Sequence, residues 1–185
     1  MISMPFEIKR LDPSLKDDFF RIHSQENDFG FCHCVFWRVP IREDWDKRSA
    51  VQNRKLREKL FEKGISDGYL LYIDHEPIAW CQCCPIEDLV RLKQRVAFED
   101  GDKYWVIPCL LMKKSHRSRG YMKKMLGMVL EDLKVRDVKR VRAYPKVTEV
   151  FDPMDNWTGS EEMFQDLGFK KIDERRGLAI YEREL

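Results

Sequence analysis

The pattern of apolar and polar positions predicts a strand, a turn and a helix in direct succession between residues 104 and 135. An apolar run from Tyr104 to Met112 ends at a basic turn of small residues, and an amphipathic segment follows that turn. Apolar residues in this segment recur at spacings of three and four, which is typical of one buried helix face. They are Met122, Met125, Leu126, Val129 and Leu133. We expect the rest of the chain to be arranged around this unit.

Short apolar runs elsewhere predict further strands that complete a sheet. The runs 69–73 and 77–84 are separated only by Asp74-His75-Glu76, which indicates an antiparallel hairpin although the usual Asn-Gly turn is absent. A second hairpin is expected through 175–177, and a long polar loop over 146–159. The remaining predicted strands lie at 6–11, 140–144, 169–172 and 178–182.

Helical spacing predicts helices that pack on this sheet. One follows Asp12-Pro13-Ser14, a surface helix spans 46–63, and another spans 85–99. Ser160 is a good N-cap for a short last helix that ends at Gly168. The segment 29–40 is rich in aromatic residues and cysteine and lacks polar alternation, so we expect a buried loop or short strand that lines a cavity.

Length and composition favour one compact domain over residues 1–185. A chain of 185 residues with 43% hydrophobic and 36% charged residues is ordinary for a globular protein. The net charge of +2 gives no indication of wholesale nucleic-acid binding, and no apolar run approaches the roughly 20 residues of a membrane span. The first residues lack a secretory signal, so we expect a cytoplasmic protein. The oligomeric state stays open, with a homodimer as one option.

The basic turn is the strongest candidate for a binding site. A helix that opens directly from a turn presents unpaired backbone N–H groups and the positive end of its dipole, which together attract an anion. Cations surround this turn with no acidic residue between them, so a phosphate-bearing ligand is expected, although a solvated lysine-rich surface is the alternative. The cations are Lys113, Lys114, Arg117, Arg119, Lys123 and Lys124.

The order of elements around this turn resembles the GNAT superfamily of acyl-CoA N-acyltransferases. HRSRGYMKKML (116–126) matches the Q/R-x-x-G-x-G/A turn of that superfamily at Arg117 and Gly120, with Met122 where Gly or Ala is preferred. MFQDLGF (163–169) is similar to its closing helix, with Phe164 where many members have tyrosine. FCHCVFWR, EPIAWCQCCP, VIPCLLM, RAYP and GSEEMFQDLGF together resemble one bacterial branch.

The resemblance implies a fold and a cofactor site. The fold is of the α/β (α+β) class, with a mixed, mostly antiparallel central sheet, helices on both faces, and the strands at 104–112 and 140–144 splayed around the site of acetyl-CoA. The first of these strands would pair with pantetheine and the turn would hold the pyrophosphate. The implied residues are Leu110, Leu111, Met112, Lys113, Arg117, Ser118, Arg119, Gly120, Tyr121, Met122 and Lys123.

Acyl transfer to an amine needs a base for the amine, a donor for the developing oxyanion and an acid for the departing thiolate. The backbone amide near Leu111 or Met112 is the expected oxyanion donor. Because Phe164 has no proton to give, Tyr144 is our candidate acid, with core packing as its alternative role. Glu87 is our candidate base, beside Asp88 and Glu99, and each of these carboxylates also fits a plain surface position.

Six cysteines allow a second kind of site. In extended strands Cys32 and Cys34 would face one way, as would Cys81 and Cys83, and two such pairs can form a tetrahedral zinc site. Because zinc sites usually use C-x-x-C spacing, we expect buried free thiols and no metal.

The sequence therefore favours an N-acetyltransferase that moves an acetyl group from acetyl-CoA to a primary amine of a small molecule or peptide by direct attack. A non-catalytic module that binds acyl-CoA is the alternative, and a thiol-ligated metal protein is a third hypothesis.

Overall fold

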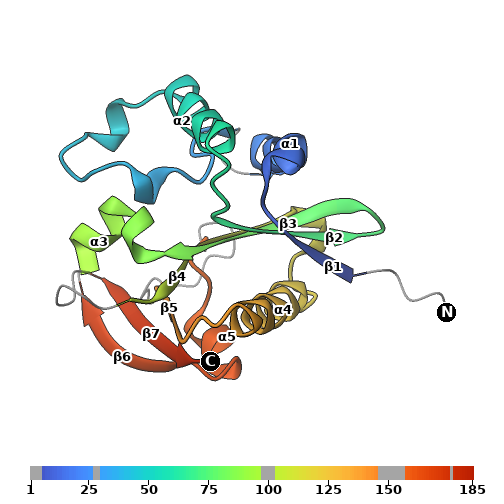
Figure 1. Ribbon diagram of the computed structural model, residues 1–185, viewed down its shortest axis with the longest axis vertical. Helices are drawn as coiled ribbons and strands as arrows, with labels where there is room; N and C mark the ends of the chain where they lie inside the picture. The colour runs from blue at the N-terminus through green and yellow to red at the C-terminus, as the bar shows by residue number, and fades with distance from the viewer. Residues whose placement is uncertain (1–5, 27–29, 97–102, 146–156, 176) are drawn as a thin grey trace.

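A single seven-stranded sheet forms the centre of the computed structural model, which describes residues 6–26, 30–96, 103–145, 157–175 and 177–185 (Figure 1). The strand order is β1-β2-β3-β4-β5-β7-β6. Neighbouring strands run antiparallel except β4 and β5, which are parallel, so the expected mixed sheet is confirmed. The strands are β1 (Phe6–Arg10), β2 (Gly68–Ile73), β3 (Glu76–Pro85), β4 (Trp105–Met112), β5 (Arg140–Ala143), β6 (Lys170–Arg175) and β7 (Leu178–Glu184).

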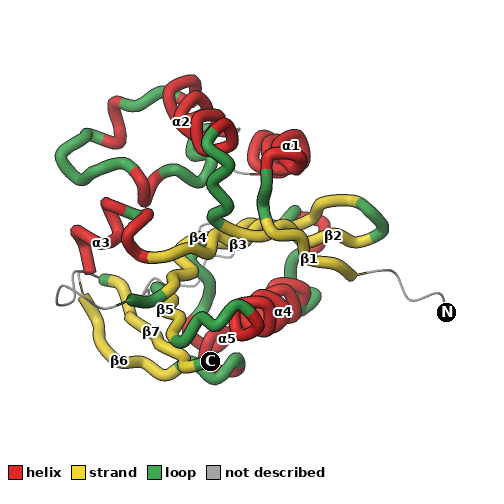
Figure 2. The backbone as a smooth tube through the Cα atoms, in the orientation of Figure 1, coloured by secondary structure: helices red, strands yellow, loops and turns green. Residues whose placement is uncertain are grey.

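Helices cover both faces of this sheet, as expected. Figure 2 shows α1, α2 and α3 on one side of the strands and α4 and α5 on the other. The helices are α1 (Lys16–Glu26), α2 (Ala50–Glu62), α3 (Val90–Val96), α4 (Tyr121–Val135) and α5 (Glu161–Asp166). Short 3₁₀ turns lie at Pro13–Leu15, Phe36–Arg38, Trp45–Lys47, Ile86–Asp88 and Lys114–His116. Within the described ranges, no helix combines the length and apolar character needed to cross a bilayer.

The apolar face of α4 fills the core beneath the sheet. Its fully buried residues recur at helical spacing, and they pack against β3, β5 and α5. Met122, which we expected on this face, is only partly buried at its start. The fully buried residues are Met125, Leu126, Val129, Leu130 and Leu133.

The β2–β3 hairpin is confirmed, and its turn explains how it forms without Asn-Gly. Asp74 and His75 both have positive φ angles, of 50° and 65°. Two consecutive residues of positive φ are the signature of a type I′ turn, whose twist matches that of antiparallel strands. Aspartate and histidine tolerate this conformation better than most residues do.

The segment 30–40 differs from the expected strand alternative. His33 and Cys34 have φ angles of 45° and 53°, so the chain turns there and continues into the 3₁₀ turn at Phe36–Arg38. The turn is held from α2, because the buried Arg57 guanidinium donates to the carbonyl oxygens of His33 at 3.1 Å and Cys34 at 2.9 Å. The segment is therefore a loop fixed by a buried cation.

The helix at 50–62 is less of a surface helix than its many charges indicated. Arg57 and Asn53 are fully buried in it. Arg57 pairs with the buried carboxylate of Asp67 at 2.8 Å, and Arg38 pairs with the same carboxylate at 3.0 Å. The charge pattern wrongly indicated a surface helix here, because a buried ion group places charged residues on the inner face of the helix.

The helix expected over 85–99 is shorter than predicted. A 3₁₀ turn occupies Ile86–Asp88, and α3 begins only at Val90. Residues 97–99, with Glu99, lie outside the described residues.

The two cysteine pairs do not meet. Cys81 and Cys83 face α4, whereas Cys34 packs with Cys109 on the opposite face of the sheet. The extended geometry that a shared zinc site requires is lost at Cys34, because of its positive φ angle. Across the part of the chain that the structure describes, no three His, Cys, Asp or Glu side chains gather in a way that would bind a metal ion.

Candidate active site

Strands β4 and β5 separate halfway along β4. They pair at only three positions, Trp105 with Val141, Val106 with Arg142 and Ile107 with Ala143. Strand β5 ends at Ala143, whereas β4 continues to Met112. The residue after the last pair is Pro108, which has no N–H to donate to a neighbouring strand. The edge of β4 from 108 to 112 is therefore not paired with β5.

A β-bulge in β4 lies at the same point. On β3, Gln82 and Cys84 are two residues apart, yet their partners on β4, Cys109 and Val106, are three apart. The extra residue in β4 bends the strand and increases its twist. The bulge and the missing donor of Pro108 together explain why β4 leaves β5, which confirms the expected splay.

Backbone amides point into the splay. The Leu110 N–H donates to the Trp157 carbonyl oxygen at 2.6 Å, on the side away from β3, whereas the Lys113 N–H donates to Ile78 of β3 at 2.9 Å. Because successive amides of a strand point to opposite edges, the Met112 N–H shares the open edge and the Leu111 N–H faces β3. Of the two oxyanion donors expected from the sequence, only the Met112 amide faces the splay, and the Leu110 amide joins it.

Solvent reaches this half of β4. Residues 109–112 keep 5 to 9% of their surface exposed, whereas Val106 and Ile107 before the bulge keep none.

The turn after β4 directs its backbone towards an anion. Gly120, at φ 74°, precedes α4, and this left-handed conformation strains any residue with a Cβ. The first helical hydrogen bond joins the Lys124 N–H to the Gly120 carbonyl oxygen at 3.1 Å. The N–H groups of residues 121–123 therefore have no acceptor within α4, and the first turn carries no acidic residue.

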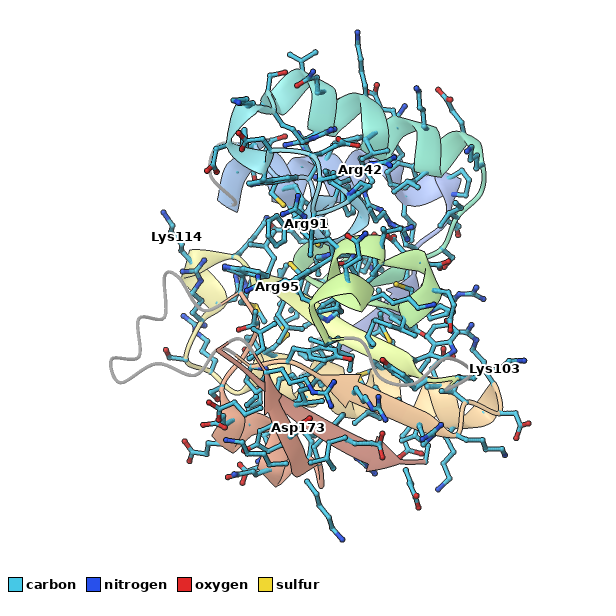
Figure 3. The ribbon with its side chains drawn as sticks, turned by 90° about the vertical axis from the view of Figure 1, so that its left-hand side faces the viewer. Arg42, Arg91, Arg95, Lys103, Lys114 and Asp173 are labelled. Carbon is cyan, nitrogen blue, oxygen red and sulfur yellow. The ribbon has the colours of Figure 1, made fainter. Side chains whose placement is uncertain are left out.

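The cations near this turn differ in the groups that they contact. Lys113 is buried and pairs with Glu76, which holds the pKa of the Glu76 carboxyl below its usual range. Lys123 pairs with Asp166 of α5 at 2.6 Å, and Arg117 donates to the Met112 carbonyl oxygen at 3.1 Å. Lys114 extends from the molecule beside the turn (Figure 3). The charge of Lys113 faces Glu76, whereas the other cations border the helix start.

Ser118, Arg119 and Tyr121 complete the turn that the sequence pointed to. Ser118 has a φ angle of 59° and is exposed, as is Arg119. Tyr121 packs against Phe6 of β1, with ring centroids 5.7 Å apart. The residues predicted from 117 to 123 therefore lie together at one end of the splay, and Leu110 and Met112 lie along it.

Tyr144 follows β5 directly and lies on the face of the sheet opposite α4. Its side chain is fully buried in what we term the α3 cluster, which includes Trp37, Leu89, Leu92, Tyr104 and Val106. Burial, together with Tyr104, raises the pKa of Tyr144 well above its usual value, so the phenol keeps its proton at neutral pH.

The predicted base is less enclosed than Tyr144. Glu87 is exposed in the 3₁₀ turn after β3. Burial raises the pKa of the neighbouring Asp88 carboxyl. Phe164 is fully buried on the α4 side and packs against Phe169, with ring centroids 5.3 Å apart.

Sequence reasoning missed Pro108 and Trp157. A proline inside an apolar strand is a signal of a bulge or an unpaired edge, so Pro108 was detectable. Trp157 stood in a polar loop without periodicity, and no pattern indicated that its carbonyl oxygen reaches Leu110.

The acetyltransferase (GNAT) family matches the chain over residues 17–169, which include β2 to β5 and the turn before α4. No curated protein matches the sequence.

Several solved structures share the fold. An acetyltransferase from Thermus thermophilus has a TM-score of 0.58 and 16% identity over 100% of both chains. The PaiA N-acetyltransferase from Thermoplasma acidophilum, solved with coenzyme A, has a TM-score of 0.57 and 15% identity over 98% of this chain and 100% of its own. The polyamine N-acetyltransferase of Drosophila melanogaster has a TM-score of 0.58 and 8% identity over 98% of this chain and 100% of its own. With the family match spanning most of its length, the chain belongs to the GNAT family of acetyltransferases.

Proposed function

We propose that the protein transfers an acetyl group from acetyl-CoA to a primary amine by direct attack. The observation that carries the proposal is the open edge of β4, which runs directly into the N-terminus of α4. Acetyl-CoA needs a strand edge for the amides of its pantetheine arm and an anion site for its phosphates. This chain offers both, one after the other.

The residues present fit acetyl-CoA. The Leu110 and Met112 amides face the splay, where the pantetheine arm would pair. The N–H groups of residues 121–123 would hold the pyrophosphate, with Arg117 and Arg119 beside them. Leu110 already donates to a carbonyl oxygen, that of Trp157, and a thioester oxygen would take the same hydrogen bond in its place.

The chemistry then requires three proton and charge movements. The nitrogen lone pair of the neutral amine attacks the thioester carbon, and the Leu110 or Met112 N–H stabilises the oxygen as it becomes negative. The C–S bond breaks, and the CoA thiolate takes the proton of Tyr144. The exposed carboxylate of Glu87 would accept the proton of the amine through water and then release it to solvent, and the proton given up by Tyr144 would be replaced along the opening through which the thiol leaves.

A module that binds acyl-CoA without turnover is the second candidate, and Phe164 favours it. This buried ring stands where many members of the family have a tyrosine, so the usual proton donor is absent on the α4 side. The two functions differ in whether CoA thiol is released.

Release of CoA thiol from acetyl-CoA, measured with a panel of primary amines, tests the proposal. The panel should include amino acids, an aminoacyl peptide, aromatic amines and spermidine, with calorimetric titration of CoA in parallel. Amine-dependent thiol release, with the acetylated amine identified by mass, supports the transferase. Tight CoA binding without thiol release for any amine supports the binding module.

A further inference from the structure

One buried hydrogen-bond donor, the indole N–H of Trp37, has no acceptor among the described residues. The Trp37 side chain is 2% exposed. An indole N–H is a donor only, and buried donors in folded proteins are almost always satisfied. An unpartnered donor of this kind indicates a ligand atom that accepts its hydrogen bond.

Trp37 lies on the side of the splay where the second substrate would enter. Its ring centroid is 5.9 Å from that of Trp157, whose carbonyl oxygen accepts the Leu110 N–H. Trp37 also shares the α3 cluster with Tyr144, the proposed acid. Because the helix start that would hold the phosphates lies on the α4 face, the opposite face is left for the amine.

Arginines flank this tryptophan. The Arg95 guanidinium lies 5.9 Å from the Trp37 ring centroid, and the Arg91 guanidinium lies 4.8 Å from that of Phe36. Figure 3 shows Arg42, Arg91 and Arg95 on the same side of the molecule, with both of the latter on α3.

The two arginines of α3 are not equivalent. Arg91 is used in the fold, because it donates to the carbonyl oxygens of Val39 at 2.8 Å and of Pro40 at 2.9 Å. Arg95 makes no ion pair with any carboxylate of the described chain. Burial, together with the nearby Arg95, lowers the pKa of Arg91, and the carboxylate of Glu43 opposes this effect.

The charge of Arg95 argues against a polycationic acceptor. A second ammonium group would face Arg95, and the faces of Phe36 and Trp37 that would attract it by cation–π contact are already used by arginines. A carboxylate suits this region better than an ammonium group, because it pairs with a guanidinium and accepts hydrogen bonds.

We infer that the acceptor is an α-amino acid or a related amine that carries a carboxylate, with this carboxylate held by the Trp37 indole N–H and the Arg95 guanidinium. The inference rests on the proposed function and names its substrate class. Trp157 is 37% exposed and lies against Trp37.

Matched amines that differ only in the carboxylate test this inference. Phenylalanine is compared with phenethylamine and tryptophan with tryptamine, with each kcat/KM referred to the concentration of neutral amine because the carboxylate lowers the pKa of the nitrogen. We expect kcat/KM to favour the amino acid by at least about tenfold, which corresponds to about 1.4 kcal/mol. Equal values within each pair, or a preference for spermidine, would overturn the inference.

Two variants test whether Arg95 and Trp37 cause the preference for a carboxylate. Arg95→Gln and Trp37→Phe should each raise KM for the amino acid about tenfold and bring the ratio within each pair towards one. Lys93→Gln, an exposed cation of the same helix, is the matched control and should preserve the ratio. CoA affinity reports whether each variant is folded. A loss of rate that is equal for both members of a pair would contradict the assigned role.

Calorimetric binding of phenylalanine and phenethylamine to the CoA-loaded protein separates the acceptor class from the transferase activity. Carboxylate-dependent binding without thiol release would support the acceptor class and contradict the transferase. Thiol release without carboxylate preference would do the reverse.

Discussion

The buried ion group of Arg57, Asp67 and Arg38 makes a strong prediction, because it fixes the loop that carries Trp37. Arg57 and Asp67 are fully buried and lie 2.8 Å apart. Arg57 also donates to the carbonyl oxygens of His33 and Cys34. An Arg57→Met variant keeps much of the side-chain volume but leaves three acceptors without this donor.

The expected cost follows from the burial of the partners. Breaking a buried ion pair by removing one member costs about 3 to 5 kcal/mol, because the remaining charge is left without its partner. Asp67 keeps Arg38 at 3.0 Å, which limits the loss to this range. For a chain of this size, the cost corresponds to a decrease in Tm of about 6 to 20 °C.

Urea and thermal unfolding measure this cost, with Arg54→Met as the control on the same helix. Arg54 is exposed and pairs with Glu58 at 3.1 Å, so its loss should cost less than about 1 kcal/mol. A destabilisation of Arg57→Met no larger than that of the control would refute the reasoning.

The pH dependence provides an independent check. Burial alone would raise the pKa of the Asp67 carboxyl, but Arg57 and Arg38 hold it below its usual range. A lowered pKa contributes stability above the unfolded pKa of about 3.9, and this contribution is lost as pH falls through the folded pKa. The difference in stability between wild type and Arg57→Met should therefore be largest near neutral pH and shrink below about pH 4. A difference that stays constant on acidification would contradict the role of Asp67.

Three further predictions concern single side chains. Tyr144→Phe should lower kcat at least about tenfold with unchanged CoA affinity, as measured by thiol release and calorimetry; an unchanged kcat would remove Tyr144 as the acid. Glu87→Gln should lower kcat at neutral pH more than Asp88→Asn does, and equal losses in the two variants would leave the base elsewhere. Burial lowers the pKa of His33 to about 4. Because the unfolded chain takes up this proton near pH 6.5 and the folded chain does not, stability should fall from about pH 6.5 to 4. His33→Asn should flatten that part of the curve, and NMR titration of His33 near pH 6.5 would contradict this prediction.

The elements that the sequence predicted well are those with a strong local period. Strand β4, its turn and α4 follow from an apolar run, a glycine and helical spacing, all within about 35 residues. The β2–β3 hairpin follows from two apolar runs with too short a connection for any other geometry. Gly120 precedes α4 in the left-handed conformation, for which few residues other than glycine are suited.

The features that the sequence concealed depend on contacts between distant segments. Nothing near Arg57 in the sequence indicates that Asp67 and the loop at 33–34 enclose it. The direction of the Leu110 amide depends on the bulge in β4, which is defined only by its register with β3. Cys81 and Cys83 pack on the α4 face whereas the loop with Cys34 packs on the opposite face, which spacing alone does not indicate. The proposed CoA side of the site is therefore formed by one continuous segment, whereas the proposed acceptor side combines several segments.

The central claim is that acetyl-CoA binds along β4 with its phosphates at the start of α4. Calorimetric titration of acetyl-CoA into the Gly120→Glu variant tests it most directly. Gly64→Glu is the matched control, because Gly64 has a φ angle of 64°, an open surrounding like that of Gly120, and a position at the end of α2. At an effective dielectric constant of about 20, a carboxylate about 5 Å from one phosphate charge costs about 3 kcal/mol. We therefore predict that Gly120→Glu weakens acetyl-CoA binding by about 100-fold or more and that Gly64→Glu leaves it unchanged. Equal affinities in the two variants would contradict the account.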